Sequence, residues 1–387
     1  MKAFLIAAEE SGDRLGAALM RALCQASGGT LQFSGVGGGE MASGGLASLY
    51  PIDDMAFMGI TEILRRVPII LHRIRATADA VIAVRPDVLV IIDSPDFTHR
   101  VARRVRAALP AIPIVNYVSP TVWAWRPGRA RAMRGYVDHV LALLPFEPDA
   151  HARLGGPPCT YVGHPIVEEV SALRPNDAEA RRRRSSPPVL LVLPGSRRHE
   201  IERLAGVFGD TVARVVARVG AVEVVVPTIL HLRDQIEHAT AQWPVRPRIV
   251  LDAADKHAAF RVARAALAKS GTVTLELALA GVPMVAAYRV SWIEAELGRR
   301  LLDLSSVILA NLVLGENVVP EFLQRDCTAE NLAQALVPLF TDTPERRRQV
   351  EAFARLDAIM EIGTASPAQR AADIVLALAR TDRSALR

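Results

Sequence analysis

The 387-residue sequence has little cysteine and no long hydrophobic run free of helix breakers. Its three cysteines, Cys24, Cys159 and Cys327, are far apart and form no Cys-x-x-Cys or Cys/His cluster, which excludes a disulfide scaffold and a zinc site. The longest uncharged stretch, Ala107 to Trp125, contains three prolines and is a poor transmembrane helix. The first apolar run, Ala3 to Ala8, is too short for a secretory signal. We therefore predict a cytoplasmic protein with reduced thiols.

Lysine and aromatic residues are also scarce. Only 3 of the 46 basic residues are lysines, aromatics make up 5%, and no nucleic-acid recognition motif accompanies the arginines, so no nucleic-acid partner is expected. The net charge of +5 is uneven: Phe97 to Val137 carries eight arginines and no acid, so the rest of the chain sums to −3. Ile63 to Ala78 adds four more arginines without an acid. Such a basic surface suits nucleic acid, an anionic membrane or a phosphorylated substrate, and composition alone does not choose among them.

Short Val-, Ile- and Leu-rich runs alternate with longer helical patterns along most of the chain. Apolar runs without polar alternation are typical of parallel strands covered on both faces, so the predicted class is α/β with doubly wound sheets. The expected strands are 2–8, 31–36, 88–92, 114–118, 139–143, 189–193, 222–226, 248–251, 265–268 and 284–287.

The segment 171–188 interrupts this alternation, because it is poor in apolar residues and ends in Ser-Ser-Pro-Pro. We interpret it as a linker between domains at 1–170 and 189–340, followed by a helical tail at 341–387. Ligands of open α/β sheets bind beyond the carboxyl ends of the strands, which predicts a site in a cleft between the two domains.

Two turns of the second half are suited to anions. At Pro194-Gly195-Ser196-Arg197 a buried strand runs directly into a helix, where free N–H groups and an arginine favour phosphate. A capped turn with a surface arginine is the alternative. The segment 269–276 repeats the pattern, and Glu276 lies where it either binds ribose hydroxyls or interacts with the helix dipole.

In the first half, Asp93 and Asp96 follow the buried strand 88–92. Asp93 lies where a general base is expected, and two helix caps are the alternative. The run Gly35 to Gly39 is interpreted as a glycine-rich turn, because Glu40 and the missing downstream acid break the dinucleotide pattern. The apolar and basic segment 55–75, with Pro68 as a break, is either a buried helix or a lipid-contacting surface.

Together these segments resemble the lipid-A-disaccharide synthase family, two-domain inverting glycosyltransferases with the GT-B fold. The blocks that carry the resemblance are 9–13, 57–60, 92–97, 116–125, 144–147, 162–165, 193–197, 270–272 and Asn311. Their number and order make the resemblance specific over nearly the full length. Ala8 departs from the family, which usually has glycine there, and the linker and tail match poorly.

The resemblance implies transfer of 2,3-diacylglucosamine from UDP to the 6-hydroxyl of 2,3-diacylglucosamine 1-phosphate, giving the β-1,6 disaccharide 1-phosphate and UDP. It implies that Asp93 is the general base and that Arg197 neutralises the departing diphosphate. Neither a metal nor another cofactor is expected. The donor-binding residues that it implies are Gly195, Ser196, Arg197, Ser270, Gly271, Thr272, Glu276 and Asn311. The acceptor or cleft residues are Glu9, Ser11, Asp13, Met58, Gly59 and Ser119.

The acylated substrates make the segment 55–75 and the arginine-rich window candidates for contact with an anionic inner membrane, without crossing it. A homodimer is expected from the family alone. The alternatives are another GT-B enzyme, such as a UDP-N-acetylglucosamine epimerase, which needs no acyl-binding segment, and a nucleic-acid-binding module.

Overall fold

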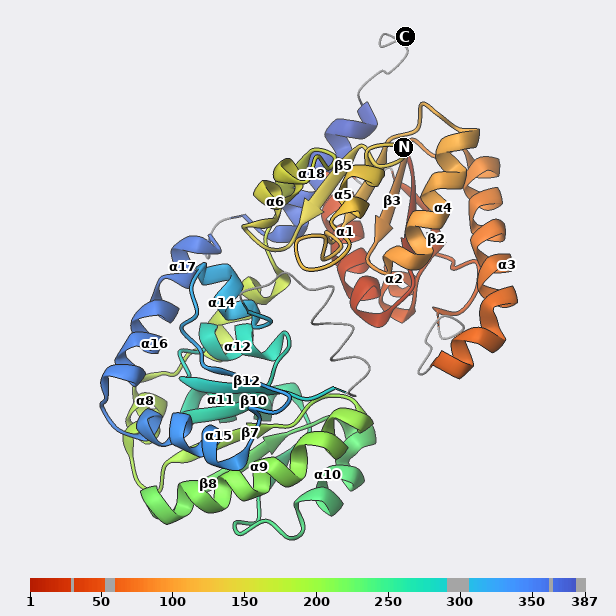
Figure 1. The fold of residues 1–387 in the computed structure, drawn as a ribbon. Helices are drawn as coiled ribbons and strands as arrows, with labels where there is room; N and C mark the ends of the chain where they lie inside the picture. The colour runs from red at the N-terminus through yellow and green to blue at the C-terminus, as the bar shows by residue number, and fades with distance from the viewer. Residues whose placement is uncertain (29–30, 53–59, 291–305, 362–364, 381–387) are drawn as a thin grey trace. The chain divides into compact units, whose positions relative to one another are not determined.

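The computed structural model describes residues 1–28, 31–52, 60–290, 306–361 and 365–380, without the side chains of residues 60–66. The chain forms two compact units (Figure 1). Unit 1 comprises Met1–Pro165 and Gly363–Arg387, and unit 2 comprises Ile166–Ile362. Both are parallel sheets with helices around them, as the apolar runs predicted.

Unit 1 is built on six parallel strands in the order β2-β1-β3-β4-β5-β6. The strands are β1 Lys2–Ala7, β2 Gln32–Val36, β3 Val88–Ile92, β4 Ile114–Tyr117, β5 His139–Ala142 and β6 Cys159–Tyr161. The central strands β3 and β4 are fully buried, which explains the continuous apolar sequence of β3. The prediction missed β6, a three-residue edge strand without an apolar run.

The helices of unit 1 include the last helix of the chain. They are α1 Glu10–Ser27, α2 Gly39–Ser43, α3 Ile60–Val84, α4 Pro95–Ala108, α5 Gly128–Met133, α6 Glu147–Arg153 and α18 Pro367–Arg380. Helix α18 packs against α1, and its Ala371, Val375 and Leu376 join the core that Leu5 and Leu19 share (Figure 1). The segment predicted as one tail is therefore divided between the two units.

Unit 2 also has six parallel strands, in the order β12-β11-β10-β7-β8-β9. The strands are β7 Val189–Leu193, β8 Glu223–Pro227, β9 Arg248–Val250, β10 Ala263–Lys269, β11 Met284–Tyr288 and β12 Glu321–Leu323. The prediction missed β12, another short edge strand. The helices are η2 Pro165–Glu168, α7 Val170–Leu173, α8 Asp177–Arg184, α9 Arg198–Val219, η3 Leu230–Leu232, α10 Arg233–Thr240, α11 Ala253–Val262, α12 Val273–Leu279, α14 Leu309–Leu314, α15 Ala329–Leu336, η4 Val337–Phe340, α16 Pro344–Ala354 and α17 Leu356–Ile359.

The segment interpreted as a linker is more ordered than its composition predicts. Asn176 and Glu179 form a capping box that starts helix α8. The guanidinium of Arg183 donates to carbonyls at the carboxyl ends of α11 and α12, including Phe260 at 3.0 Å and Gly281 at 3.1 Å. Burial lowers the pKa of Arg183 to about 10. An arginine-rich run thus forms a helix held against the fold by carbonyl groups.

Both sheets reverse their winding direction at one place. In unit 1 the chain moves outward from β1 to β2 and then returns to place β3 on the other side of β1. In unit 2 the equivalent pair is β7 and β10. Ligands of doubly wound sheets bind at the carboxyl ends of such a pair. The candidate residues after β1, β3, β7 and β10 therefore lie at the two expected binding positions.

Candidate functional site

Asp93 and its neighbours connect the carboxyl ends of β1 and β3. The hydroxyl of Ser94 donates to Glu9 Oε1 at 2.7 Å, and that of Ser11 lies 3.5 Å from Asp93 Oδ2. Asp93 and Ser94 both have left-handed backbone conformations, with φ of 53° and 44°. Non-glycine residues rarely adopt this conformation, and such strain is concentrated at functional sites. The structure thus brings together three predicted site residues, Asp93, Glu9 and Ser11, and adds Ser94.

The environment of Asp93 favours its protonated form. Burial raises the pKa of its carboxyl group and the nearby Glu9 carboxylate raises it further, against the hydrogen bonds from the Ser94 N–H and the Ser11 hydroxyl. A carboxylate with a raised pKa is a stronger base than an ordinary aspartate. Asp93 is suited to accept a proton.

Asp13 is committed to the fold of unit 1. Its buried carboxylate accepts hydrogen bonds from the backbone N–H groups of Gly38, Glu40 and Met41 at 2.7, 2.9 and 3.1 Å. These bonds hold the glycine-rich turn at the start of α2 against α1. A cavity of about 800 Å³ lies beside the turn, and its lining includes Glu9, Glu10, Gly37, Ser48 and Ile52. Asp13 thus shapes the wall of this cavity.

Ser119 also makes its contacts within unit 1. Its hydroxyl donates to the carbonyl of Pro120 at 3.0 Å and lies 2.9 Å from Nε2 of the buried His151. The preceding Val118 is strained, with φ of 76°. A buried chain supports it: Tyr136 Oη lies 3.1 Å from His99 Nδ1, His99 Nε2 is 3.0 Å from Asn116 Oδ1, and Asn116 Nδ2 donates to the Val118 carbonyl at 2.8 Å.

In unit 2, the predicted anion-binding turn already holds a carboxylate. Glu200 Oε2 accepts the backbone N–H groups of Ser196 and Arg197, at 2.9 and 3.3 Å. Gly195 has φ of 131°, and a Cβ atom there would lie 2.5 Å from Glu200 Oε2. The glycine therefore makes room for Glu200. The guanidinium of Arg197 remains 64% exposed.

Lys269 approaches the same glutamate from β10. Its Nζ lies 2.9 Å from Glu200 Oε1, and 5.1 Å from the centre of the Tyr288 ring. Burial opposes the ionisation of Glu200, yet the contact with Lys269 and the Ser196 N–H hold the pKa of its carboxyl below the usual range. Neither role was predicted from the sequence, although glutamate three residues after a turn is typical of a capping box.

The second predicted turn of unit 2 follows Lys269. The hydroxyl of Ser270 is buried and donates to the Val307 carbonyl at 3.0 Å. Gly271 and Thr272 lead into α12, and Glu276, inside that helix, forms an ion pair with Lys256 of α11. Glu276 thus lies in the first turns of α12, as predicted, and Lys256 neutralises its carboxylate.

The side-chain amide of Asn311 has all its hydrogen bonds satisfied within the protein. Its Oδ1 accepts the N–H groups of Val318 and Val319 at 3.0 and 2.9 Å, while its Nδ2 donates to the Val319 carbonyl and to Ser306 Oγ at 3.0 and 3.2 Å. The side chain is buried. Its amide therefore joins α14 to the segment before β12. Met58 and Gly59, both predicted acceptor or cleft residues, lie outside the described residues.

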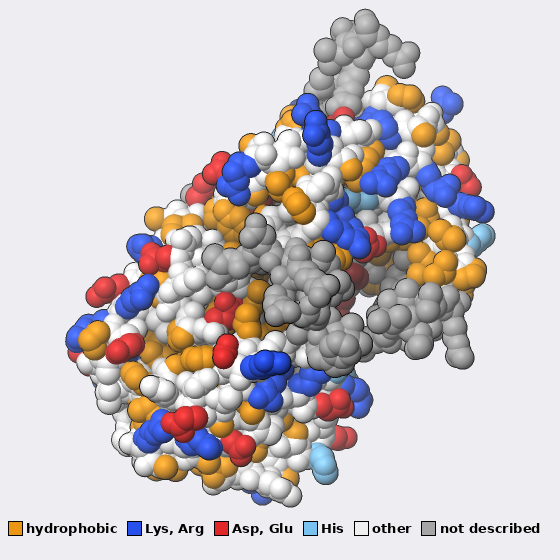
Figure 2. Space-filling model, viewed as in Figure 1, with side chains coloured by type: hydrophobic (Ala, Val, Ile, Leu, Met, Phe, Trp, Pro, Cys, Tyr) orange, Lys and Arg blue, Asp and Glu red, His pale blue; other side chains and the backbone are white. Residues whose placement is uncertain are grey.

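The basic window forms part of the surface of unit 1. Arg106 and Arg129 pair with acids just outside the window, Asp138 and Asp96, at 2.5 and 2.8 Å. The other arginines are exposed: Arg100, Arg103, Arg104, Arg126, Arg131 and Arg134. Helix α3 continues through Pro68, whose side chain is exposed. Figure 2 shows arginines and apolar side chains side by side over α3 and α4.

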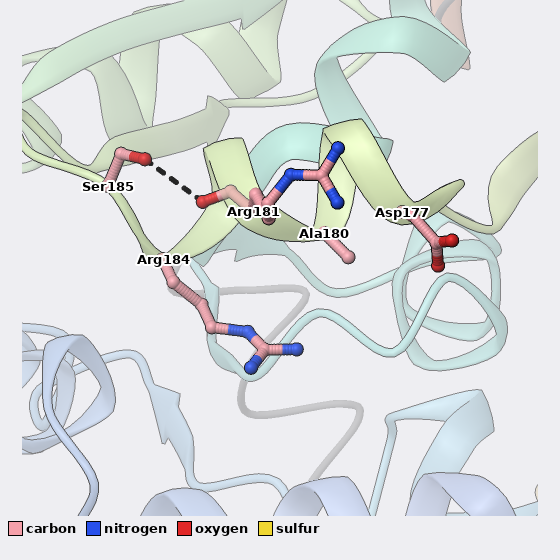
Figure 3. A pocket seen from close by; sticks show the side chains of 5 residues that line it. All are labelled: Asp177, Ala180, Arg181, Arg184 and Ser185. Atoms are coloured by element: carbon pink, nitrogen blue, oxygen red, sulfur yellow. Dashed lines mark hydrogen bonds between the residues drawn. The ribbon is translucent and has the colours of Figure 1, made fainter.

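A smaller cavity of about 330 Å³ lies on α8 (Figure 3). Its lining comes from this helix and the next residue, Ser185, whose hydroxyl donates to the Arg181 carbonyl at 3.0 Å. It contains no predicted site residue.

Over the described part of the chain, no cluster of three or more His, Cys, Asp or Glu side chains is arranged to bind a metal. Within the same residues, no helix has the length and hydropathy needed to cross a bilayer.

The sequence comparisons agree on one family over nearly the whole chain. The family model described as lipid-A-disaccharide synthetase matches residues 3–375. A lipid-A-disaccharide synthase of Rhodopseudomonas palustris (strain HaA2) is 63% identical over 377 residues, which are 97% of this chain and 96% of the relative. One of Rhodospirillum centenum is 46% identical and is covered to 93%.

Comparison with solved structures shows the fold. The UDP-GlcNAc 2-epimerase of Neisseria meningitidis, bound to UDP-GlcNAc, has a TM-score of 0.57 at 12% identity and covers 97% of this chain, with 99% of its own length matched. The MurG of Acinetobacter baumannii gives 0.57 at 15% identity with the same coverage. These neighbours and the two six-stranded parallel sheets confirm the predicted GT-B fold.

Proposed function

This chain belongs to the lipid-A-disaccharide synthetase family, and we propose that unit 1 binds its sugar acceptor and unit 2 its nucleotide-linked donor. It is a glycosyltransferase that catalyses the disaccharide-forming step of lipid A biosynthesis, and its substrates are lipid A precursors. In chemical terms, 2,3-diacylglucosamine passes from UDP to the 6-hydroxyl of 2,3-diacylglucosamine 1-phosphate. The family match carries this assignment, and the place of the partly buried Asp93 at the winding reversal of unit 1 supports its role as the base.

Asp93 takes the proton of the acceptor 6-hydroxyl as that oxygen attacks the anomeric carbon of the donor. The new carbon–oxygen bond forms on the face opposite the bond to phosphate, which breaks and releases UDP. Inversion in one step needs no enzyme nucleophile. Glu9 and Ser11 orient Asp93, with Ser94 held on Glu9. Asp13 and Ser119 act indirectly, because their side chains bond within unit 1.

On unit 2, the exposed guanidinium of Arg197 stabilises the charge that develops on the departing diphosphate. The turns 195–197 and 270–272 lie at the winding reversal where the nucleotide of a doubly wound sheet is expected. Glu276 accepts ribose hydroxyls from its place in α12. Asn311 supports this side through the backbone that it holds.

Replacing Asp93 tests the assignment. Asp93→Asn should lower kcat by about 10²- to 10⁴-fold, the range for loss of a general base, and leave UDP affinity nearly unchanged. In the parent protein the rate should fall on acidification at a higher pH than for an ordinary aspartate, because the pKa of Asp93 is raised. Asp96→Asn, at an exposed carboxylate on the same turn, is the matched control. Full UDP release by Asp93→Asn would remove Asp93 from the mechanism.

We also propose that unit 1 associates peripherally with an anionic inner membrane. In α3 the side chains of Val67, Ile69 and Leu71 are 39%, 46% and 37% exposed, and α4 with its exposed arginines packs beside it. Serine at these three positions should reduce sedimentation with anionic vesicles; unchanged sedimentation argues against this surface. The expected homodimer stays a prediction that light scattering tests.

A further inference from the structure

One ion pair spans the winding reversal of unit 2. Glu200 belongs to α9, which follows β7, and Lys269 ends β10, the strand beside β7. Their side chains are only 6% and 17% exposed, and Nζ and Oε1 are 2.9 Å apart. Burial of two charges is costly unless the pair is close and has further hydrogen bonds. Both conditions hold here, so the ion pair stabilises the carboxyl edge of the sheet in unit 2.

The second oxygen of Glu200 is attached to the donor turn. It accepts the N–H groups of Ser196 and Arg197, so that neither group faces outward. The absence of a side chain at Gly195 leaves the space that the carboxylate fills. The path of the backbone from Gly195 to Arg197 is therefore fitted to a carboxylate beneath it. Whatever holds that carboxylate in place also holds the turn.

Lys269 is the residue that holds it. Arg197, the other cation near Glu200, has its closest nitrogen 3.8 Å from Oε1 and is mostly exposed. The ammonium of Lys269 is closer, more buried and also positioned by the Tyr288 ring of β11. Without it, a buried carboxylate would lack its close cation, and would either take up a proton or move toward water. Either change loosens the turn, because a protonated carboxyl is a weaker acceptor and a displaced one loses the Ser196 and Arg197 N–H groups.

We propose that Lys269 and Glu200 are positioning residues for donor binding: Lys269 fixes the Glu200 carboxylate, which fixes the turn that presents Arg197 to the diphosphate. The inference rests on the proposed function, because it assigns the donor to this turn. It assigns Lys269 no contact with the donor. Lys269 at the end of β10 and Glu200 in α9 thus act across the reversal on a single turn.

UDP affinity, measured by calorimetry on the full chain, tests the proposal. Lys269→Met should weaken UDP binding about tenfold or more, as expected for loss of a charge-assisted contact, and Lys269→Arg should restore most of it. Arg182→Met is the matched control, since it removes a partly buried cation that lies 2.8 Å from Glu223 elsewhere in unit 2. Unchanged UDP affinity in Lys269→Met, with the fold intact by circular dichroism, overturns the proposal.

A double-mutant cycle separates positioning from direct contact. If Lys269 acts through Glu200, the double variant Lys269→Met/Glu200→Gln should bind UDP no more weakly than the weaker single variant. Fully additive losses would mean that Lys269 touches the nucleotide, and would overturn the positioning role. The variant Arg197→Ala distinguishes failure of this inference from failure of the proposed function. If it weakens UDP binding and Lys269→Met does not, this inference fails and the proposed function stands. If Arg197→Ala has no effect, the donor assignment itself fails.

Discussion

The two winding reversals have the same topology and different chemistry. In unit 1, β1 and β3 are followed by Glu9 and Asp93, each within reach of a serine hydroxyl, on backbone strained at non-glycine residues. In unit 2, β7 and β10 end in a glycine turn and a lysine, with the carboxylate of Glu200 neutralised between them. One edge has a carboxyl group with a raised pKa, and the other has the exposed guanidinium of Arg197 beside a neutralised carboxylate. The fold supplies two equivalent positions, and the local side chains decide their use.

The difference extends to how each edge is held. Unit 2 relies on saturated hydrogen bonding, of which Asn311 is the clearest case, with four bonds from one amide. Unit 1 contains buried titratable groups whose pKa is shifted by burial. Burial lowers the pKa of His99 to about 4 and raises that of Glu147 to about 7. Unit 1 should therefore respond to pH more strongly than unit 2.

The largest effect is expected for Asn311→Ala. The substitution leaves the N–H groups of Val318 and Val319 and the Val319 carbonyl without their partner in a buried place. At about 1 to 3 kcal/mol for each unsatisfied group, with partial relaxation, the free energy of unfolding should fall by about 3 to 5 kcal/mol. Urea denaturation followed by circular dichroism measures it.

Asn331→Ala is the matched control, since this asparagine in the same unit donates one exposed hydrogen bond to the Asp326 carbonyl. It should cost less than about 1 kcal/mol. Equal losses in the two variants would contradict the saturated network as the source of stability at this edge.

The roles of Asn311, Glu200 and Lys269 show where sequence reasoning ends. The buried strands and the turns at 93–96 and 194–197 were predictable, because apolar runs and breakers are local signals. The edge strands β6 and β12 were not, because three residues carry no periodicity. The pairing of Glu200 with Lys269 joins distant segments through tertiary packing. No local sequence pattern predicts this pairing.

The packing partner of the last helix, α18, was likewise not predictable from its sequence. The sequence of α18 has helical periodicity, which predicted a helix without naming its partner. Its apolar face packs on α1 and β-strands of unit 1, while α16 and α17, which precede it, belong to unit 2. Similarly, Asp13 looked like a site acid, and only the structure places three backbone N–H groups on it.

A smaller effect is expected from Glu147→Gln, which tests the titration of unit 1. Glu147 accepts the N–H groups of Leu143 and Leu144 and the indole N–H of Trp123, yet burial raises the pKa of its carboxyl from 4.5 to about 7. Because the folded pKa exceeds the unfolded value, stability from this group is fully present below pH 4.5. It is lost as pH rises to about 7, and the total loss is on the order of 3 kcal/mol.

Glutamine does not titrate, so this decline in the unfolding free energy between pH 4.5 and 7 should flatten in Glu147→Gln. Urea denaturation at a series of pH values measures it, and the slope is the readout, since one hydrogen bond to Trp123 is lost at every pH. Glu330→Gln, at an exposed carboxylate of unit 2 paired with Arg214 and Arg218, is the control. A slope unchanged by Glu147→Gln would mean that the carboxyl is ionised throughout this range.

The smallest effect concerns the backbone strain that follows β4 in unit 1. Val118 has φ of 76°, where a side chain is unfavourable and glycine is not. Val118→Gly should therefore be more stable than Val118→Ala by about 1 kcal/mol, although glycine ordinarily weakens a fold relative to alanine. Ala142→Gly, in the extended strand β5 of the same sheet, should show the ordinary order and lose about 1 kcal/mol. If alanine is the more stable residue at both positions, the strain at Val118 is not held by the buried chain from Tyr136 through Asn116, and the contrast between the two edges reduces to their charges alone.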